Sequence, residues 1–150
     1  MESIEIYTDG GCHGNPGPGA WAFVIQLSDD AEDSGSELQT TNNRMELQAV
    51  IEALRYVVRQ EHCDRAINVH TDSQYVRNGI TTWIRSWLRN GWKTASRKPV
   101  KNQDLWMRLH ELDQLVHPVW NWVRGHAGNR LNERCDQLVQ NEIAQMEIQD

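Results

Sequence analysis

The order of strand-like and helix-like segments is the feature that most constrains how this chain can fold. Residues 3–9 (SIEIYTD) alternate apolar and polar side chains with the period of a β-strand. Residues 20–27 (AWAFVIQL) predict a second, mostly buried strand, and residues 37–41 (ELQTT) predict a third strand that returns beside it. We expect the acidic stretch between these strands, residues 28–37 (SDDAEDSGSE), to be a solvated hairpin loop. The first part of the chain therefore predicts an antiparallel meander.

A helical repeat follows this meander. Apolar side chains recur at helical spacing at Leu47, Val50, Leu54 and Val57. We expect the helix to start near Asn43, which suits the N-cap position, and Glu46 three residues later resembles the acid of a capping box. Residues 67–72 (INVHTD) then predict a strand that ends in an aspartate.

Further helices and one more strand complete the pattern. Short helical pieces follow the aspartate, and a longer helix is marked by the apolar stripe Leu105, Leu109, Leu112 and Val116. Residues 119–123 (VWNWV) predict the last strand, and a final helix is expected from Asn132 to about Ala144, with residues 145–150 as a short tail. Three hairpin strands followed by helix–strand alternation predict an α/β fold, with helices covering one mixed sheet, in a single domain over residues 1–150.

Composition argues against several classes of protein. No apolar run approaches the ~20 residues that a membrane span needs, and the first residues lack the basic start and apolar core of an export signal. Cys12, Cys63 and Cys135 are odd in number and far apart, without a C-x-x-C pair, which argues against a zinc site or a disulfide framework. A reducing cytoplasm fits this cysteine usage best.

The charge of the chain is unevenly distributed. The net charge is -6, yet residues 73–103 contain no Asp or Glu and carry seven cations. These are Arg77, Arg85, Arg89, Lys93, Arg97, Lys98 and Lys101. Trp83, Trp87 and Trp92 interleave with them, and cations with aromatic rings are the side chains that contact phosphates, sugars and bases. The alternative is that the tryptophans pack on the core while the cations are merely solvated; we favour a nucleic-acid partner.

The glycine-rich stretch at residues 7–21 (YTDGGCHGNPGPGAW) raises the possibility of a phosphate-binding loop. Such a loop needs consecutive backbone N–H donors and a helix directly behind them. Pro16 and Pro18 remove two donors, and a strand follows instead of a helix. We therefore interpret the stretch as a stiffened strand-to-strand connection that presents Asp9.

Four carboxylates stand out by their positions. Asp9 and Asp72 each end a predicted strand, and Glu46 and Asp136 each lie in the first turns of a predicted helix. If the two strands are neighbours, the four groups converge at one end of the sheet, where their mutual repulsion would favour a divalent cation such as Mg²⁺. Capping, a favourable helix-dipole position and turn formation are the plain alternatives for each carboxylate taken singly.

His126 lies between two glycines in RGHAGN. A loop imidazole that titrates near neutral pH can transfer protons at an adjacent site. The alternative is an inert surface histidine.

Taken together, these motifs resemble one family. The segments YTDGGCHGNPGPGAW, TTNNRMEL, TDSQYV, GWKTASRKPVKNQDLW and GHAGN, followed by NERCD, are similar to those of type 1 ribonuclease H of the bacterial kind. They occur in the right order from about Ile4 to Leu138, which is nearly the whole chain.

The resemblance implies a ribonuclease H-like fold with strand order 3-2-1-4-5 and helices on both faces of the sheet. It implies an endonuclease that cleaves the RNA strand of RNA–DNA hybrids and leaves 5′-phosphate and 3′-hydroxyl ends. We expect the protein to act as a monomer. Asp9, Glu46, Asp72 and Asp136 match the family's metal-binding catalytic positions, for two Mg²⁺ ions with Mn²⁺ as a substitute. His126 matches its proton-transferring histidine.

The resemblance also implies a set of substrate contacts. Those at the minor groove of the hybrid involve Cys12, Asn15, Asn43 and Gln74, and Asn42 is a further substrate contact. Thr41 and Asn102 match a pocket for a DNA phosphate, and Trp83 with Trp87 match the channel for the DNA strand. Residues 85–101, which include Lys93, match a basic protrusion that grips the hybrid largely independently of sequence. The competing hypotheses are a non-catalytic hybrid-binding module and another nuclease on the same fold; the complete carboxylate set and the minor-groove asparagines favour the hybrid-specific enzyme.

Overall fold

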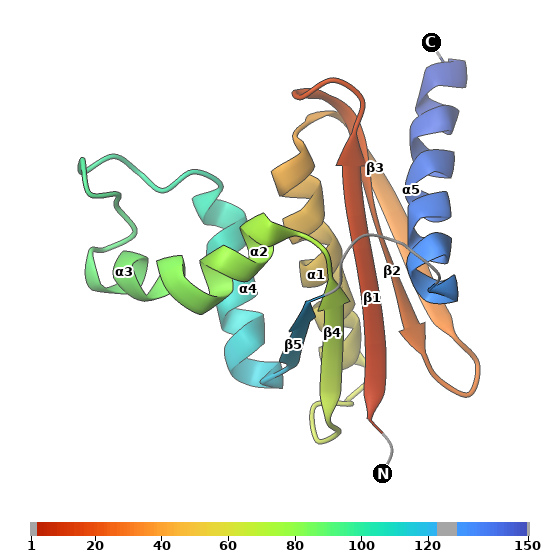
Figure 1. The fold of residues 1–150 in the computed structure, drawn as a ribbon, viewed down its shortest axis with the longest axis horizontal. Helices are drawn as coiled ribbons and strands as arrows, with labels where there is room; N and C mark the ends of the chain where they lie inside the picture. Colours follow the sequence, from red (N-terminus) through yellow and green to blue (C-terminus); the bar gives the residue numbers. More distant parts are fainter. Residues whose placement is uncertain (1–2, 123–128, 150) are drawn as a thin grey trace.

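Within residues 3–122 and 129–149, which this computed structural model describes, the chain folds around one five-stranded mixed sheet (Figure 1). Its strands are β1 (Ile4–Cys12), β2 (Gly17–Gln26), β3 (Ala31–Thr40), β4 (Ile67–Thr71) and β5 (Val119–Trp122). They are arranged in the order β3-β2-β1-β4-β5. The first three are antiparallel, whereas β4 pairs parallel with both β1 and β5. The order and the strand directions confirm the predicted fold class.

Helices cover both faces of this sheet (Figure 1). α1 (Asn42–Arg59) packs on one face with α4 (Gln103–Val116) beside it, and α5 (Arg130–Gln149) covers the other face. Between β4 and α4 the chain leaves the sheet through α2 (Gln74–Asn78), the π-helix η1 (Gly79–Trp83) and α3 (Ile84–Arg89). α3 and the loop that follows it project away from the body.

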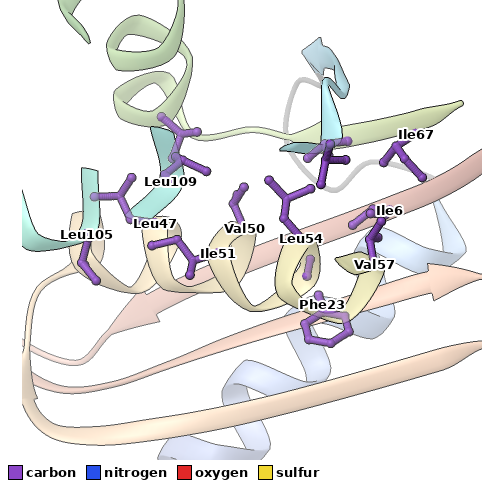
Figure 2. Packing of buried hydrophobic residues seen from close by; sticks show 14 of the residues in the cluster. Ile6, Phe23, Leu47, Val50, Ile51, Leu54, Val57, Ile67, Leu105 and Leu109 are labelled. Atoms are coloured by element: carbon purple, nitrogen blue, oxygen red, sulfur yellow. The ribbon is translucent and has the colours of Figure 1, made fainter. Parts of the chain in front are cut away.

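The main core lies between α1 and the sheet. The predicted stripe of α1 is fully buried against Ile6 and Phe23, and Leu105 and Leu109 of α4 close it from the side (Figure 2). A smaller core on the opposite face sets Val139, Ile143 and Met146 of α5 against Ala20 and Ala22 of β2. The two cores fix α1 and α5 on opposite faces of β1, so that both helices reach the same central strand.

The predicted acidic hairpin loop is largely a strand. β3 begins at Ala31, and its exposed acids lie opposite β2, with Asp33 paired to Phe23. An edge strand needs no apolar alternation, because pairing with one neighbour holds it and charges on its free side discourage further pairing. The sequence pattern therefore marked only the last part of β3.

Both ends of the helical predictions also need correction. Thr41, not Asn43, is the N-cap of α1: its backbone is extended and its Oγ1 accepts a hydrogen bond from the N–H of Arg44 at 3.2 Å. At the other end, α5 runs to Gln149 instead of ending near Ala144, so the segment after Ala144 is helical and not a tail. Burial of Met146 gives this last part of α5 an apolar contact. Among the described helices, none has both the length and the apolarity required to cross a membrane.

Candidate active site

Strand register brings Asp9 and Asp72 together. β1 and β4 run parallel with Tyr7 opposite His70, and two residues further along the same register sets Asp9 level with Asp72. β4 ends at Thr71, but β1 continues to Cys12, so Asp9 does not end its strand as predicted. It lies instead on the stretch of β1 that extends beyond β4, and its side chain is buried. The two carboxylates thus meet at the edge of the sheet where β4 stops.

Glu46 reaches the same point from α1 because Gly10 has no side chain. A Cβ on Gly10 would lie 2.4 Å from the carbonyl carbon of Met45, so only glycine allows α1 to approach β1 this closely. The Gly10 N–H donates a 2.9 Å hydrogen bond to Oε1 of Glu46. Glu46 therefore does not act as the acid of a capping box; its carboxylate points to β1.

The three carboxylates form a compact negative cluster. Asp9, Glu46 and Asp72 each offer an oxygen, and these oxygens lie within 4.8 Å of one another. Burial, together with the charges of Asp9 and Asp72, raises the pKa of Glu46 well above its usual range, and the hydrogen bond from Gly10 offsets only part of this rise. Oε2 of Glu46 is buried and, among the described residues, has no hydrogen-bond partner. Crowded oxygens with an unpaired buried acceptor are the donor set that a hard divalent cation satisfies.

Asp136 lines the same cleft from α5 but stands outside this cluster of three. Its position depends on how α5 begins. Oδ1 of Asn129 accepts hydrogen bonds from the N–H groups of Leu131 and Asn132, at 2.9 and 3.0 Å, and so caps the helix. The buried thiol of Cys135 lies 3.2 Å from the carbonyl oxygen of Tyr7 on β1. His126, the predicted proton-transfer residue, lies outside the described residues.

Four of the predicted substrate contacts, Asn15, Asn42, Asn43 and Gln74, lie around this cleft in different ways. Asn42, Asn43 and Gln74 are exposed and line the cleft. Asn15 is also exposed, and its Oδ1 accepts a 3.1 Å hydrogen bond from the N–H of Asn42, which ties the glycine-rich connection to the start of α1.

The thiol of Cys12 is turned into its own loop. It lies 2.7 Å from the carbonyl oxygen of Gly14 and 3.3 Å from those of Gly17 and Thr40. Burial raises the pKa of this thiol. These contacts of the thiol with backbone carbonyl oxygens stabilise the loop that carries Asn15.

The predicted phosphate-pocket residues belong to a network that the sequence patterns did not reveal. The guanidinium of Arg44 donates to Oδ1 of Asn102 at 3.2 Å and forms two hydrogen bonds with Asp104, at 3.1 and 2.9 Å. The hydroxyl of Tyr75 accepts hydrogen bonds from Nδ2 of Asn102 at 3.1 Å and from the indole of Trp106 at 3.0 Å. The pairing with Arg44 holds the pKa of Asp104 below its usual range. Arg44 and Asn102 are far apart in the sequence, so their contact could be found only once α1 and α4 lie side by side.

Aromatic packing joins the cationic segment to the body. We call residues 85–101 the basic handle. The Trp87 ring packs against three other indole rings. Its centroid lies 6.0 Å from that of Trp83, 6.0 Å from that of Trp92 and 5.4 Å from that of Trp106. Trp83 and Trp87 are partly buried, whereas Lys93 and the other cations of the handle are exposed. The alternative that these tryptophans pack on the core is therefore partly correct, because each ring is partly buried against it.

A glycine fixes where this handle leaves the body. A Cβ on Gly79, in η1, would lie 1.9 Å from the indole of Trp106. Because Trp106 is fully buried in the main core, η1 can pass over it only where no side chain intervenes. A glycine in an otherwise helical segment was the available sequence signal, but its reason lies in a contact with α4.

Comparisons with known proteins agree with this architecture. The sequence model of the family described as RNase H matches residues 1–144. A ribonuclease H of Treponema denticola is 52% identical over 151 residues, and the match covers 91% of this chain and 94% of that protein.

Solved structures share the fold over nearly the whole of this chain. The crystal structure of LC9-RNase H1, a type 1 RNase H with the type 2 active-site motif, superposes with a TM-score of 0.78 at 32% identity, covering 95% of this chain and 72% of that one. LC11-RNase H1, crystallised in complex with an RNA/DNA hybrid, has a TM-score of 0.69 at 25% identity over 95% of this chain and 98% of that one.

Proposed function

Because this chain belongs to the ribonuclease H family, type 1, and is an endonuclease for the RNA strand of RNA–DNA hybrids, we propose that its carboxylate cleft is the catalytic centre. Asp9, Glu46, Asp72 and Asp136 would hold two divalent ions there, with Mg²⁺ as the working metal and Mn²⁺ as a substitute. The observation that carries this proposal is the cluster of three carboxylates within 4.8 Å. Bound ions of this kind supply activation of a water and stabilisation of the leaving 3′ oxygen.

The protein's own groups prepare this centre. The Gly10 N–H holds Oε1 of Glu46, and the buried Oε2 has no hydrogen-bond partner among the described residues, so it is available as a metal ligand. The preference of hard divalent ions for oxygen donors supports the choice of Mg²⁺ over softer metals. We propose His126 as the group that accepts or releases a proton as the products form. Cleavage would leave 5′-phosphate and 3′-hydroxyl ends.

We propose that the exposed amides around the cleft read the minor groove. Their donors and acceptors can form hydrogen bonds with a 2′-hydroxyl, the group by which RNA differs from DNA. These amides belong to Asn15, Asn42, Asn43 and Gln74. Cys12 braces the connection that carries Asn15. This arrangement supports selection of the RNA strand by its sugar and not by its bases.

The DNA strand would be held by backbone contacts. Thr41 and Asn102 would form the phosphate pocket, and the exposed parts of Trp83 and Trp87 would form the channel for the DNA strand. The exposed cations of the handle, Lys93 among them, supply contacts that depend on charge and not on base sequence. Cleavage is accordingly expected at many sequences. We further propose that the protein works as a monomer in the cytoplasm, where its three free thiols remain reduced.

A substrate panel tests this function. The protein is incubated with end-labelled RNA–DNA hybrid, RNA duplex and DNA duplex, with Mg²⁺ and with EDTA. The expected result is cleavage of the RNA strand of the hybrid alone, and only with the metal. Cleavage of the DNA strand, or cleavage that survives EDTA, would refute the assignment.

A further inference from the structure

We infer that Arg44 is a positioning residue that orients the Asn102 amide, so that an N–H of Asn102 faces a phosphate of the DNA strand. The inference rests on the proposed function and extends it to a residue that has no assigned role there. It starts from the contacts of Asn102, which lies at the base of the basic handle and directly before α4.

Asn102 occupies the N-cap position of α4 without capping the helix. An asparagine at this position ordinarily turns its side-chain oxygen toward the helix to accept from backbone N–H groups. Here the side chain makes no capping hydrogen bond, and the backbone is left-handed, with φ of 61°. The amide is directed sideways instead, toward Arg44 on α1 and Tyr75 on α2.

Arg44 decides which end of this amide faces which way. A guanidinium can only donate hydrogen bonds, so its 3.2 Å contact requires the oxygen of the Asn102 amide on the side of α1. The amide nitrogen must then lie on the opposite side, where one of its two N–H groups is directed to the Tyr75 hydroxyl. The second N–H supplies the donor that a phosphate oxygen needs.

Two further contacts keep Arg44 itself in place. Its planar fork forms paired hydrogen bonds with Asp104, at 3.1 and 2.9 Å, and lysine cannot reproduce this geometry. Its backbone N–H donates to Oγ1 of Thr41, the other residue of the proposed phosphate pocket. Arg44 thus touches both pocket residues and lies two positions before Glu46 on the same helix. Without it, the Asn102 amide can rotate by half a turn and present its oxygen to the phosphate, which would repel it.

The first test is steady-state cleavage of a defined hybrid by Arg44→Met, with Arg55→Met as the matched control. Arg55 lies on the same helix and pairs with Glu52, away from the cleft. We expect Arg44→Met to raise KM about tenfold, the factor for losing one charge-assisted hydrogen bond, with kcat within about twofold of wild type. Arg55→Met should change neither. A fall in kcat at unchanged KM would overturn the inference.

A double-mutant cycle with Asn102→Ala asks whether Arg44 acts through Asn102. Removal of the amide should raise KM, and adding Arg44→Met to that variant should raise it no further. Multiplied effects would show that Arg44 acts independently of Asn102 and would overturn the inference. Arg44→Lys keeps the charge but lacks the planar fork, so it should raise KM as well; it also serves as the test variant if Arg44→Met fails to fold.

Hybrids with one neutral methylphosphonate, scanned along the DNA strand, give a readout that a purely structural role would not change. Wild type should show raised KM at each position where the neutral group replaces a contacted phosphate, and Arg44→Met should lose sensitivity at one of these positions alone, the one that faces Asn102. An unchanged profile in Arg44→Met would refute the inference. If wild type fails to cleave any hybrid, the proposed function itself is wrong, and this outcome is distinct from all the others.

Discussion

The carboxylate cleft and the basic handle hold like charges in opposite ways. In the cleft, three carboxylates on β1, α1 and the end of β4 are brought within 4.8 Å of one another beside the main core. In the handle, the cations are spread over an exposed segment that leaves the body. Close, buried charges of one sign oppose folding unless a counterion joins them, whereas solvated and separated charges scarcely affect stability.

The difference shows how each region depends on the rest of the fold. The cleft needs packed elements to hold its oxygens close together, and the packing of β1 between α1 on one face and α5 on the other provides this constraint. The handle needs only a fixed orientation relative to the body, and the contacts of Trp87 with Trp83, Trp92 and Trp106 provide it. Substitutions that remove a charge from the cleft should therefore lower activity and raise stability. Substitutions of the handle cations should affect substrate binding alone.

Neutralising the cleft is the strongest way to test this contrast. Asp9→Asn keeps the size of the side chain but removes a negative charge beside Glu46. We expect cleavage to fall by roughly 10³-fold or more, as loss of several kcal/mol of transition-state stabilisation requires. The metal-free variant should nevertheless melt at a higher temperature than wild type, because the repulsion is smaller. Asp64→Asn, at an exposed position between α1 and β4, is the matched control and should alter neither property.

Crowding the joint of the handle tests the claim that it depends on the body for its direction. Gly79→Ala places a methyl group against the buried indole of Trp106, and overpacking of this kind costs about 3 kcal/mol. The loss should appear in denaturant unfolding even though alanine is the better helix former. Ser86→Ala, on the exposed surface of α3, should leave stability unchanged. Equal stability of the two variants would mean that η1 is not fixed by this contact.

Proton and metal linkage sharpens the contrast from the cleft side. The folded-state pKa of Glu46 is raised, so the native metal-free protein retains a proton that the unfolded chain releases above its ordinary value near 4.5. Stability in EDTA should therefore fall as pH rises through that range toward the raised pKa. Glu46→Gln should remove this part of the slope. Mg²⁺ at 100 times its Kd should add about 2.7 kcal/mol. A wild-type slope equal to that of Glu46→Gln would contradict the prediction.

Neutralising the handle should give the smallest effect. Replacing Lys93, Arg97 and Lys98 by glutamine is expected to raise KM about tenfold and to reduce the salt dependence by up to about 0.7–0.9 in slope per lost phosphate contact. The kcat value and the melting temperature should stay near those of wild type, since the three cations are exposed. A matched set of exposed cations, changed in the same way, controls for net charge. That set is Arg55, Arg59 and Arg108.

The positions of the candidate site residues along the chain could be predicted, because they depend on local sequence patterns. Strand alternation located Asp9 and Asp72, and helical spacing located the turn that carries Glu46. The interpretation of Glu46 as a capping acid was wrong, because local spacing cannot reveal a hydrogen bond to Gly10, which is distant in sequence. β3 was predicted too short, since an edge strand of acidic residues lacks the apolar alternation of a half-buried strand.

The sequence by itself determined the order of the elements, the chemical groups at their ends and the separation of acidic from basic segments. Those properties depend on neighbours a few residues apart, which is the range over which periodicity operates. Only the tertiary structure decided which groups meet. The meeting of Asp9 with Asp72 required the parallel register of β1 and β4, and that of Glu46 with Asp9 required a glycine under α1. The contact of Arg44 with Asn102 required two helices from distant parts of the chain to pack together, a relation that burial of the shared core fixes and no local pattern contains.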